Sequence, residues 1–280
     1  MTTLILPRRA LRAVRPALAL AWLVLVLLAL AALAPGLFTG HSPLEIEPAA
    51  ALRAPGPVHW FGTDQLGRDL FARVVYGARP SLLIGLGAIV TAVAVGALYG
   101  LASALIGSVA DRLLMRLADV LLALPQLLLA LLVLTVLGPG SVNVMVAIAV
   151  AFVPGYARVV RAEALVVRRS GYVETAVTLG QRRSVQAFRH VLPNALGPLL
   201  VLATVGFGMA LIAASGLSFL GFGAKPPSPE WGAMLAESRD FLQSAWWLGL
   251  FPGAAITLTV VAVNMAGRSA QARFTRRTSR

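Results

Sequence analysis

Cysteine is absent from this chain of 280 residues, and charge is scarce. Without cysteine, the chain can hold no disulfide, zinc–thiolate site or iron–sulfur cluster. Only 12% of the residues are charged, about half of the share that a soluble domain typically carries. The three histidines are far apart in the sequence and show no spacing typical of metal ligands. The sequence therefore offers no support for a thiol or metal enzyme.

Lysine occurs once, at position 225, where Ala224 precedes it. A nucleotide-binding P-loop reads Gly-x-x-x-x-Gly-Lys-Ser/Thr. The sequence therefore has no P-loop, and any ATP hydrolysis must come from a separate chain.

Apolar residues, by contrast, make up 58% of the sequence. Five blocks contain no Asp, Glu, Lys or Arg: residues 17–38, 80–110, 120–157, 194–224 and 241–267. One membrane crossing takes about 20 predominantly apolar residues. The third block is long enough for two crossings, and the turn-forming run that starts at Gly138 divides it. The pattern predicts an all-α, polytopic membrane protein with six transmembrane helices.

The predicted transmembrane domain covers residues 17–266, between a basic leader (1–16) and a basic tail (267–280). Its spans are expected at residues 17–37, 81–106, 117–137, 142–161, 195–215 and 246–266. External segments then cover 39–79 and 217–245, and a cytoplasmic loop covers 162–193. A cleaved signal peptide is the alternative for the first block, although its apolar run exceeds the ~7–15 residues of such a peptide.

The net charge of +13 would suggest nucleic-acid binding in a soluble protein. Here, eighteen of the 24 Lys and Arg residues fall in the segments assigned to the cytoplasm. Cytoplasmic segments of membrane proteins carry such an excess of basic residues. The distribution therefore predicts that both termini are cytoplasmic, and it predicts no nucleic-acid partner.

Several residues within or near the spans allow local predictions. Asp64 fits the N-cap of a short amphipathic external helix that leads into the second span. Gly96 and Gly100 have the spacing that lets membrane helices approach closely, or they are simply tolerated there. Asp119 is expected in the first turn of the third span, as a cap or, alternatively, as a proton relay. Pro125 should kink that span.

The cytoplasmic loop 162–193 holds the most informative pattern. Residues 172–179 form a short helical pattern that Gly180 ends as a C-cap. A second pattern begins at Ser184, an N-cap candidate, and Pro193 opens the next span. A short helix on the cytoplasmic side with basic flanks is typical of a surface that docks on a soluble partner. A solvated helix is the alternative.

The run Glu174-Thr175-Ala176, followed by Gly180 and by Leu192-Pro193, resembles the "EAA" motif of permease subunits in bacterial ATP-binding-cassette (ABC) importers. That motif reads Glu-Ala-Ala, three residues, Gly, nine residues, Ile, one residue, Leu-Pro. Thr175 and His190 depart from it. Three further segments resemble the C-type subunits of the dipeptide, oligopeptide and nickel branch: HWFGTDQLGRDLFARVVYGAR, LADVLLALPQLLLAL and GLSFLGFGAKPPSPEWGAMLAE. The resemblance covers about residues 60–264.

The resemblance implies a type I ABC-importer permease fold with a cytoplasmic coupling helix that inserts into an ATPase subunit. Glu174 would be the charged contact of this helix and Gly180 its turn. Arg182 and Arg183 would pair with acidic groups of the ATPase or, alternatively, lie at the charged membrane surface. The expected site residues are therefore Glu174, Thr175, Ala176, Gly180, Arg182, Arg183, Leu192 and Pro193. Substrate-binding residues stay unassigned.

The implied function is that of a transport subunit, not an enzyme, which forms half of a pathway for di- or oligopeptides across the bacterial plasma (inner) membrane. The expected partners are a homologous B-type permease, two ATPase subunits that bind ATP-Mg, an external or periplasmic solute-binding protein and membrane lipids. This chain itself is expected to bind no cofactor. Nickel and glutathione importers are the alternatives within the branch. A secondary transporter or a channel would need ionisable groups deep in the spans or a selectivity filter.

Overall fold

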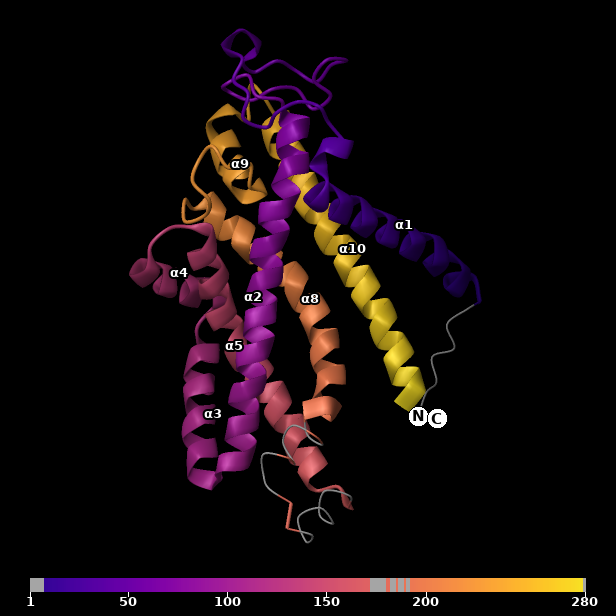
Figure 1. Ribbon diagram of the computed structural model, residues 1–280, viewed down its shortest axis with the longest axis vertical. Coiled ribbons are helices and arrows are strands. Elements are labelled where there is room, and N and C mark those ends of the chain that lie inside the picture. Colours follow the sequence, from indigo (N-terminus) through magenta and orange to yellow (C-terminus); the bar gives the residue numbers. More distant parts are fainter. Residues whose placement is uncertain (1–7, 172–179, 182–184, 186–188, 190–191, 279–280) are drawn as a thin grey trace. The chain divides into compact units, whose positions relative to one another are not determined.

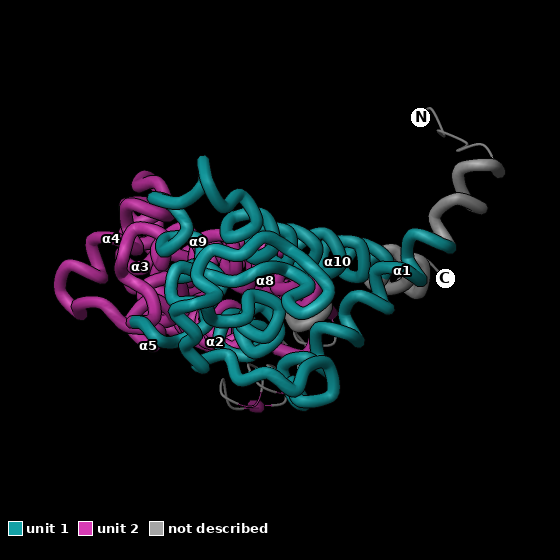
Figure 2. Tube along the Cα trace, turned by 90° about the horizontal axis from the view of Figure 1, so that it is seen from above, with its two compact units in different colours: residues 1–82, 226–280 teal, residues 83–225 magenta. Residues whose placement is uncertain are grey.

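The computed structural model describes residues 8–171, 180–181, 185, 189 and 192–278 (Figure 1). These residues are mainly helical, and their one strand-like feature is an isolated bridge between Thr63 and Asp69. The chain forms two compact units (Figure 2). Unit 1 comprises residues 1–82 and 226–280, and unit 2 comprises residues 83–225. Helix α2 (Leu70–Ile106) begins in unit 1 and continues in unit 2.

Unit 1 contains α1 (Arg8–Leu33), the start of α2, α9 (Trp231–Ser238) and α10 (Trp247–Thr278). Helix α10 packs against both α1 and α9 (Figure 1). Three short 3₁₀ turns complete the unit, at Pro35–Leu37, Pro48–Ala50 and Arg239–Phe241.

Unit 2 is organised around α5 (Ser141–Arg168), which contacts α3 (Ser108–Ala123), α4 (Gln126–Leu137) and α8 (Leu192–Phe219). Its hydrophobic core includes Leu134 of α4, Ile148 of α5 and Leu199 of α8, all of them buried. Helix α5 continues to Arg168 through Pro154, well past the predicted end of the fourth span at residue 161.

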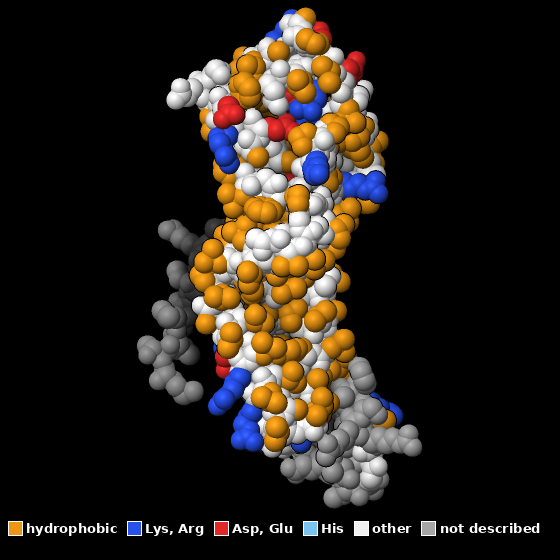
Figure 3. All heavy atoms as spheres, turned by 90° about the vertical axis from the view of Figure 1, so that its left-hand side faces the viewer, with side chains coloured by type: hydrophobic (Ala, Val, Ile, Leu, Met, Phe, Trp, Pro, Cys, Tyr) orange, Lys and Arg blue, Asp and Glu red, His pale blue; other side chains and the backbone are white. Residues whose placement is uncertain are grey.

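Five of the described helices are long and apolar enough to cross a membrane, and the bent pair α3–α4 gives a sixth if it counts as one span. Hydrophobic side chains predominate on the face shown in Figure 3. Leu20, Leu83 and Leu258 are each more than half exposed. Apolar helix faces of this kind fit hydrocarbon or a second membrane protein, because in water they would be costly.

The third predicted span, residues 117–137, is not one kinked helix. Helix α3 ends at Ala123, α4 begins at Gln126, and their axes differ by 100°. Leu124 and Pro125 have extended backbone, with ψ near 138° and 131°. Proline lacks the N–H that would continue the helix, and it disfavours helical geometry in the residue before it. Residues 108–116, which the predicted spans leave between them, are already part of α3, because this helix starts directly after Gly107.

No external helix begins at Asp64, contrary to the prediction, and α2 starts at Leu70. Asp64 instead accepts hydrogen bonds from the backbone N–H groups of Leu66 (2.9 Å) and Arg68 (3.0 Å), which stabilise a turn. Asp69 is the residue that caps α2, because its carboxylate accepts from the N–H of Ala72 (2.7 Å). Two aspartates at similar spacing compete for the cap, and local sequence does not distinguish them.

Helices α2 and α5 touch at Gly96 and Gly100, as their spacing predicts. A Cβ added at Gly96 would lie 2.7 Å from the Cβ of Tyr156, and one at Gly100 would lie 2.4 Å from the carbonyl oxygen of Ala157. Backbone cannot move aside as a flexible side chain can, so these glycines are required for the helices to approach. The contact fixes α5 against the second half of α2.

We expect Gly100→Ala to destabilise the protein by about 1–3 kcal/mol, the usual cost of adding a group to a packed core. The measurement is thermal unfolding of the purified protein in detergent. Gly155→Ala on α5 is the matched control, because a Cβ there has nothing within 4 Å. The control should be neutral or slightly stabilising, since alanine favours helix over glycine. Equal melting temperatures for the two variants would contradict the role of the α2–α5 contact.

Candidate coupling site and external charge cluster

Helix α5 leads directly into the predicted coupling loop. At its end, the N–H of Arg169 bonds the carbonyls of Val166 and Val167, and the hydroxyl of Ser170 donates to Val167 (2.5 Å). These bonds satisfy carbonyl groups that a helix end leaves without partners. The loop therefore starts from a well-formed helix end.

The structure describes three of the eight predicted coupling residues. Gly180 is exposed and has φ +74°, a left-handed conformation that favours glycine. A Cβ at this position would meet nothing within 4 Å, so the backbone angle rather than space selects the residue. Leu192 and Pro193 begin α8, where proline is tolerated because the first N–H groups of a helix have no intrahelical partner. The remaining predicted residues lie outside the described part of the chain: Glu174, Thr175, Ala176, Arg182 and Arg183.

Three arginines of α5 hold the helices beside it. Arg161 forms a two-pronged ion pair with Asp111 of α3, with Nε–Oδ1 and Nη2–Oδ2 distances of 2.5 and 2.6 Å. Arg158 pairs with Asp119 of α3, and Arg168 donates to the backbone carbonyl of Ala104 on α2. Asp119 therefore lies late in α3 and is ion-paired, whereas the sequence places it in a first turn. Asp111 occupies the first turn of α3 instead.

A buried cluster of charges joins the segment before α2 and the first turn of α2 to α9 within unit 1. Arg68 donates from Nε to Asp64 (2.6 Å) and from Nη2 to Glu237 (3.0 Å), and Arg73 lies 3.4 Å from Asp64 and 3.2 Å from Glu237. Arg68, Arg73 and Asp64 are almost fully buried. Two arginines and two carboxylates balance in charge, which is the condition for burying them. The sequence alone does not reveal this cluster, because Glu237 is 164 positions away from Arg73.

Helix α9, which the sequence leaves as an external connection, is also tied to the start of α2. Glu230 caps it by accepting from the N–H groups of Gly232 (2.8 Å) and Ala233 (2.9 Å). Trp231 is buried, and its indole N–H donates to the carbonyl of Val74 (2.8 Å). Gly77 of α2 leaves room for the segment that leads into α9, because a Cβ at this position would lie 2.1 Å from the carbonyl oxygen of Pro229. Trp231 is therefore a packing residue of unit 1.

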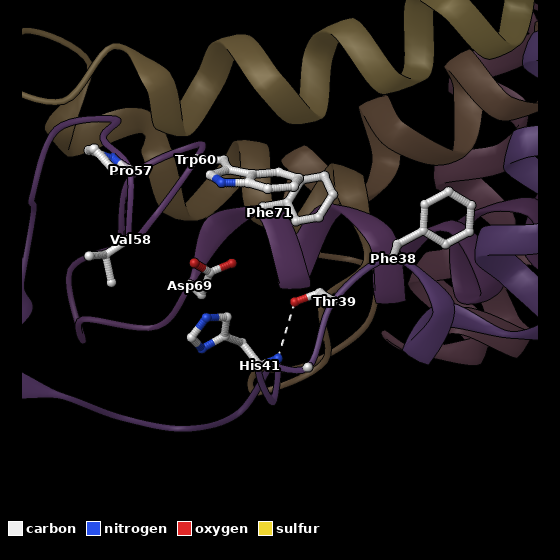
Figure 4. Close-up of a pocket in the computed structure, with 9 residues that line it drawn as sticks. Phe38, Thr39, His41, Pro57, Val58, Trp60, Asp69 and Phe71 are labelled. Atoms are coloured by element: carbon white, nitrogen blue, oxygen red, sulfur yellow. Dashed lines mark hydrogen bonds between the residues drawn. The ribbon is translucent and has the colours of Figure 1, made fainter.

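A pocket of about 270 Å³ lies among residues 38–71 (Figure 4). Asp69 and His41 lie on one side of it, and the rings of Trp60 and Phe71 lie together on another. His59 donates from Nδ1 to the carboxylate of Asp69 (2.8 Å). The described residues contain no group of three or more His, Cys, Asp or Glu side chains that could hold a metal ion. The pocket thus has aromatic walls and a carboxylate that is already hydrogen-bonded.

Comparison with known protein families identifies the family to which this sequence is similar. The family of binding-protein-dependent transport system inner membrane components matches residues 83–280. The chain belongs to this family. Its permease subunits work in ABC importers, so this permease is a transport subunit and not an enzyme. Its apolar helices make it a multi-pass protein of the inner membrane.

Curated relatives extend the match to most of the permease. A dipeptide transport system permease protein of Alkalihalophilus pseudofirmus is 44% identical over 82% of this chain and 76% of its own length. A probable D,D-dipeptide transport system permease protein of Escherichia coli is 42% identical over 88% of this chain and 82% of its own length. A glutathione transport system permease protein of Pectobacterium atrosepticum is 42% identical over 76% of this chain and 71% of its own length.

Solved structures support the fold. A chain of the MetNI methionine ABC transporter in inward-facing conformations matches with a TM-score of 0.58 at 18% identity, over 74% of this chain and 97% of that chain. A chain of an amino acid ABC transporter matches with a TM-score of 0.51 at 21% identity, over 73% of this chain and 94% of that chain. The solved structures confirm the fold, and the family match with the curated relatives confirms the resemblance to ABC-importer permeases. The family also implies partnership with another permease, with an ATPase and with a binding protein.

We expect Glu237→Gln to loosen the external segment, because two buried arginines would then share the single carboxylate of Asp64. Breaking a buried ion pair typically costs about 3–5 kcal/mol. Thermal unfolding and the rate of proteolysis at residues 39–69 measure the effect. Glu45→Gln is the matched control, since Glu45 is exposed in the same external segment. If both variants unfold and are cleaved alike, the cluster does not stabilise the segment.

Proposed function

We propose that this permease carries di- or oligopeptides and forms half of their translocation pathway. The observation that supports this substrate is the identity of 42–44% to permeases named for dipeptide transport, which extends over more than four fifths of the chain. A peptide substrate also fits the sequence segments that resemble the C-type subunits of the dipeptide and oligopeptide branch.

Glutathione is the second candidate, because relatives named for glutathione transport are 42–43% identical to this chain. Glutathione is itself a tripeptide with a γ-linked first bond. The two candidates therefore differ in backbone linkage and length rather than in chemical class. A single pathway that binds peptide groups and carboxylates would serve either of them.

ATP is proposed to bind and react on separate ATPase subunits, with Mg²⁺, and no cofactor is proposed on this chain. The single lysine at position 225 supports this division, because a P-loop requires a lysine between glycine and Ser/Thr. Glu174, Thr175 and Ala176, with Arg182 and Arg183 after the turn at Gly180, would contact the ATPase. The end of α5 at Arg168 and the start of α8 at Leu192 would anchor that contact.

Both termini and the loop between α5 and α8 are proposed to be cytoplasmic, as the distribution of arginines favours. The segments 39–79 and 217–245 would then face outward and receive the solute-binding protein. A homologous B-type permease would supply the other half of the pathway. Exposed apolar side chains on α1, such as Leu20 and Val26, fit a second membrane chain or lipid.

Substrate uptake tests the proposal directly. A deletion strain that is auxotrophic for one amino acid should fail to grow when a dipeptide is its only source, and the wild-type gene should restore growth. Free amino acid is the control for viability, and glutathione as the only sulfur source tests the second candidate. Unchanged dipeptide uptake in the deletion strain, with glutathione uptake lost, would replace the first candidate by the second.

The coupling residues are tested by Glu174→Arg. Removing one partner of a buried interfacial charge pair costs about 2–5 kcal/mol, so we expect retention of the ATPase on the purified permease to fall about tenfold or more. Membrane insertion should not change. Glu163→Arg makes the same charge reversal near the end of α5, outside the motif, and should retain the ATPase. Normal transport by the Glu174→Arg variant would show that the docking assignment is wrong.

A further inference from the structure

Helix α3 buries little apolar surface against the rest of unit 2, where Leu121 is partly buried on the hydrophobic core. Of its sixteen residues, only Ala118 is buried. At its start, Gly107 has φ +142° and open space around it, and at its end the extended residues Leu124 and Pro125 separate it from α4. In a membrane such a helix gains little from apolar burial, because lipid tails are as apolar as its own exposed side chains. Side-chain contacts must therefore determine how α3 sits on α5.

The strongest of these contacts is the pair between Asp111 and Arg161. Both carboxylate oxygens of Asp111 accept from the guanidinium of Arg161, at 2.5 and 2.6 Å. The hydroxyl of Ser103 on α2, itself buried, donates to the same carboxylate at 2.5 Å. Two-pronged pairs of this kind are shorter and stronger than ordinary hydrogen bonds, and they fix orientation as well as distance. Asp111 thus joins α3, α2 and α5 at one point.

A second pair joins the same two helices in a different environment. The side chains of Arg158 and Asp119 are 55% and 59% exposed, whereas those of Arg161 and Asp111 are 30% and 21% exposed. Exposed ion pairs contribute little, because water and salt screen them. The chain therefore contains a matched comparison: two Arg–Asp pairs between α3 and α5, of which one is shielded and doubly bonded.

Helix α5 is also the element that enters the loop after Arg168 without a break, and it is fixed to α2 by the contacts of Gly96 and Gly100. A displacement applied at the loop is therefore transmitted to α5 at one end of the loop and to α8 at the other. Whether α3 follows depends on its side-chain links, since its covalent connections are extended or glycine residues at both ends.

We propose that Asp111 and Arg161 are a positioning pair for coupling: they make α3 follow α5, so that motion at the loop reaches the bend between α3 and α4. The inference rests on the proposed function in one respect, that the loop receives force from an ATPase. The pair acts through the helices and touches neither peptide nor nucleotide. Arg158 and Asp119 are not required for this link.

Because this chain has no cysteine, introduced cysteines can be labelled in it within a transporter complex whose other subunits have been made cysteine-free. Leu113→Cys on α3 and Val166→Cys on α5 are both exposed positions for spin labels. We expect the distance between the labels to stay constant between the nucleotide-free and ATP-bound states in the otherwise wild-type chain. In an Arg161→Gln background, the distance should change on ATP binding, and in an Arg158→Gln background it should not. Equal behaviour of the two backgrounds would overturn the proposal.

Transport gives the second readout, in proteoliposomes that contain all subunits and a labelled dipeptide. Arg161→Gln should lower the number of dipeptides imported per ATP hydrolysed by about fivefold or more, which is the lower range of coupling between sites. Arg158→Gln should stay within about twofold of wild type, as an exposed pair predicts. Asp111→Asn combined with Arg161→Gln should be no worse than either change alone, because both remove one link. An equal fall of ATP hydrolysis and import would indicate lost assembly and would overturn the proposal.

The two proposals fail in distinguishable ways. A wild-type complex that hydrolyses ATP but imports no dipeptide would refute the peptide substrate, while the label distances would still test the pair. A wild-type complex that imports dipeptide with the same yield per ATP as the Arg161→Gln complex would refute the pair alone.

Discussion

The close approach of α2 and α5 is the contact on which unit 2 depends. In a membrane, helices gain little from the hydrophobic effect, because lipid tails are as apolar as leucine. Association then requires close packing, and Gly96 and Gly100 allow the backbone of α5 to lie directly against α2. Because α5 also contacts α3, α4 and α8, its position against α2 sets the positions of the others. The end of α5 at Arg168 is positioned in the same way.

Unit 1 relies on the opposite principle, the placement of rare charges. The chain has eleven acidic residues, and several of them serve a defined contact in the described part of the structure. Asp64 and Glu237 balance two buried arginines, Asp69 caps α2 and binds His59, and Glu230 caps α9. Burying such groups without partners would be costly. Asp64, Asp69 and Glu237 therefore order residues 39–69, which have little helix of their own.

Helix existence and approximate position could be predicted from the sequence, because apolar blocks near the length of a membrane crossing are a strong signal. The details that failed were those in which two local signals compete. Pro125 produces a break of 100° rather than a kink, since Leu124 before it also leaves the helix. Asp69 rather than Asp64 caps α2. The spacing of Gly96 and Gly100 predicts a close approach because two glycines four positions apart mark a contact face on their own helix, whichever helix packs against it.

In the candidate site, too, local features could be predicted from the sequence and contacts between distant residues could not. Gly180 could be predicted, because a left-handed residue after a helical pattern selects glycine locally. The cluster around Arg73 and the pair between Asp111 and Arg161 could not, because their members are distant in sequence and each residue alone looks like an ordinary solvated charge. From the sequence alone, Arg161 is one of the basic residues that predict the orientation of the protein in the membrane. The structure shows that the same side chain also forms a specific ion pair with Asp111.

Replacements of Arg158 and Arg161 should therefore differ in their effects on the permease. Replacing Arg158 removes a positive charge on the side assigned to the cytoplasm and an exposed ion pair, so orientation is its main contribution. Replacing Arg161 removes the same charge, but it also leaves Asp111 with only Ser103 as a partner. Two substitutions that are equivalent for membrane topology are therefore different for the attachment of α3. The position of a charge relative to α5, and not its sign alone, determines what it does in this fold.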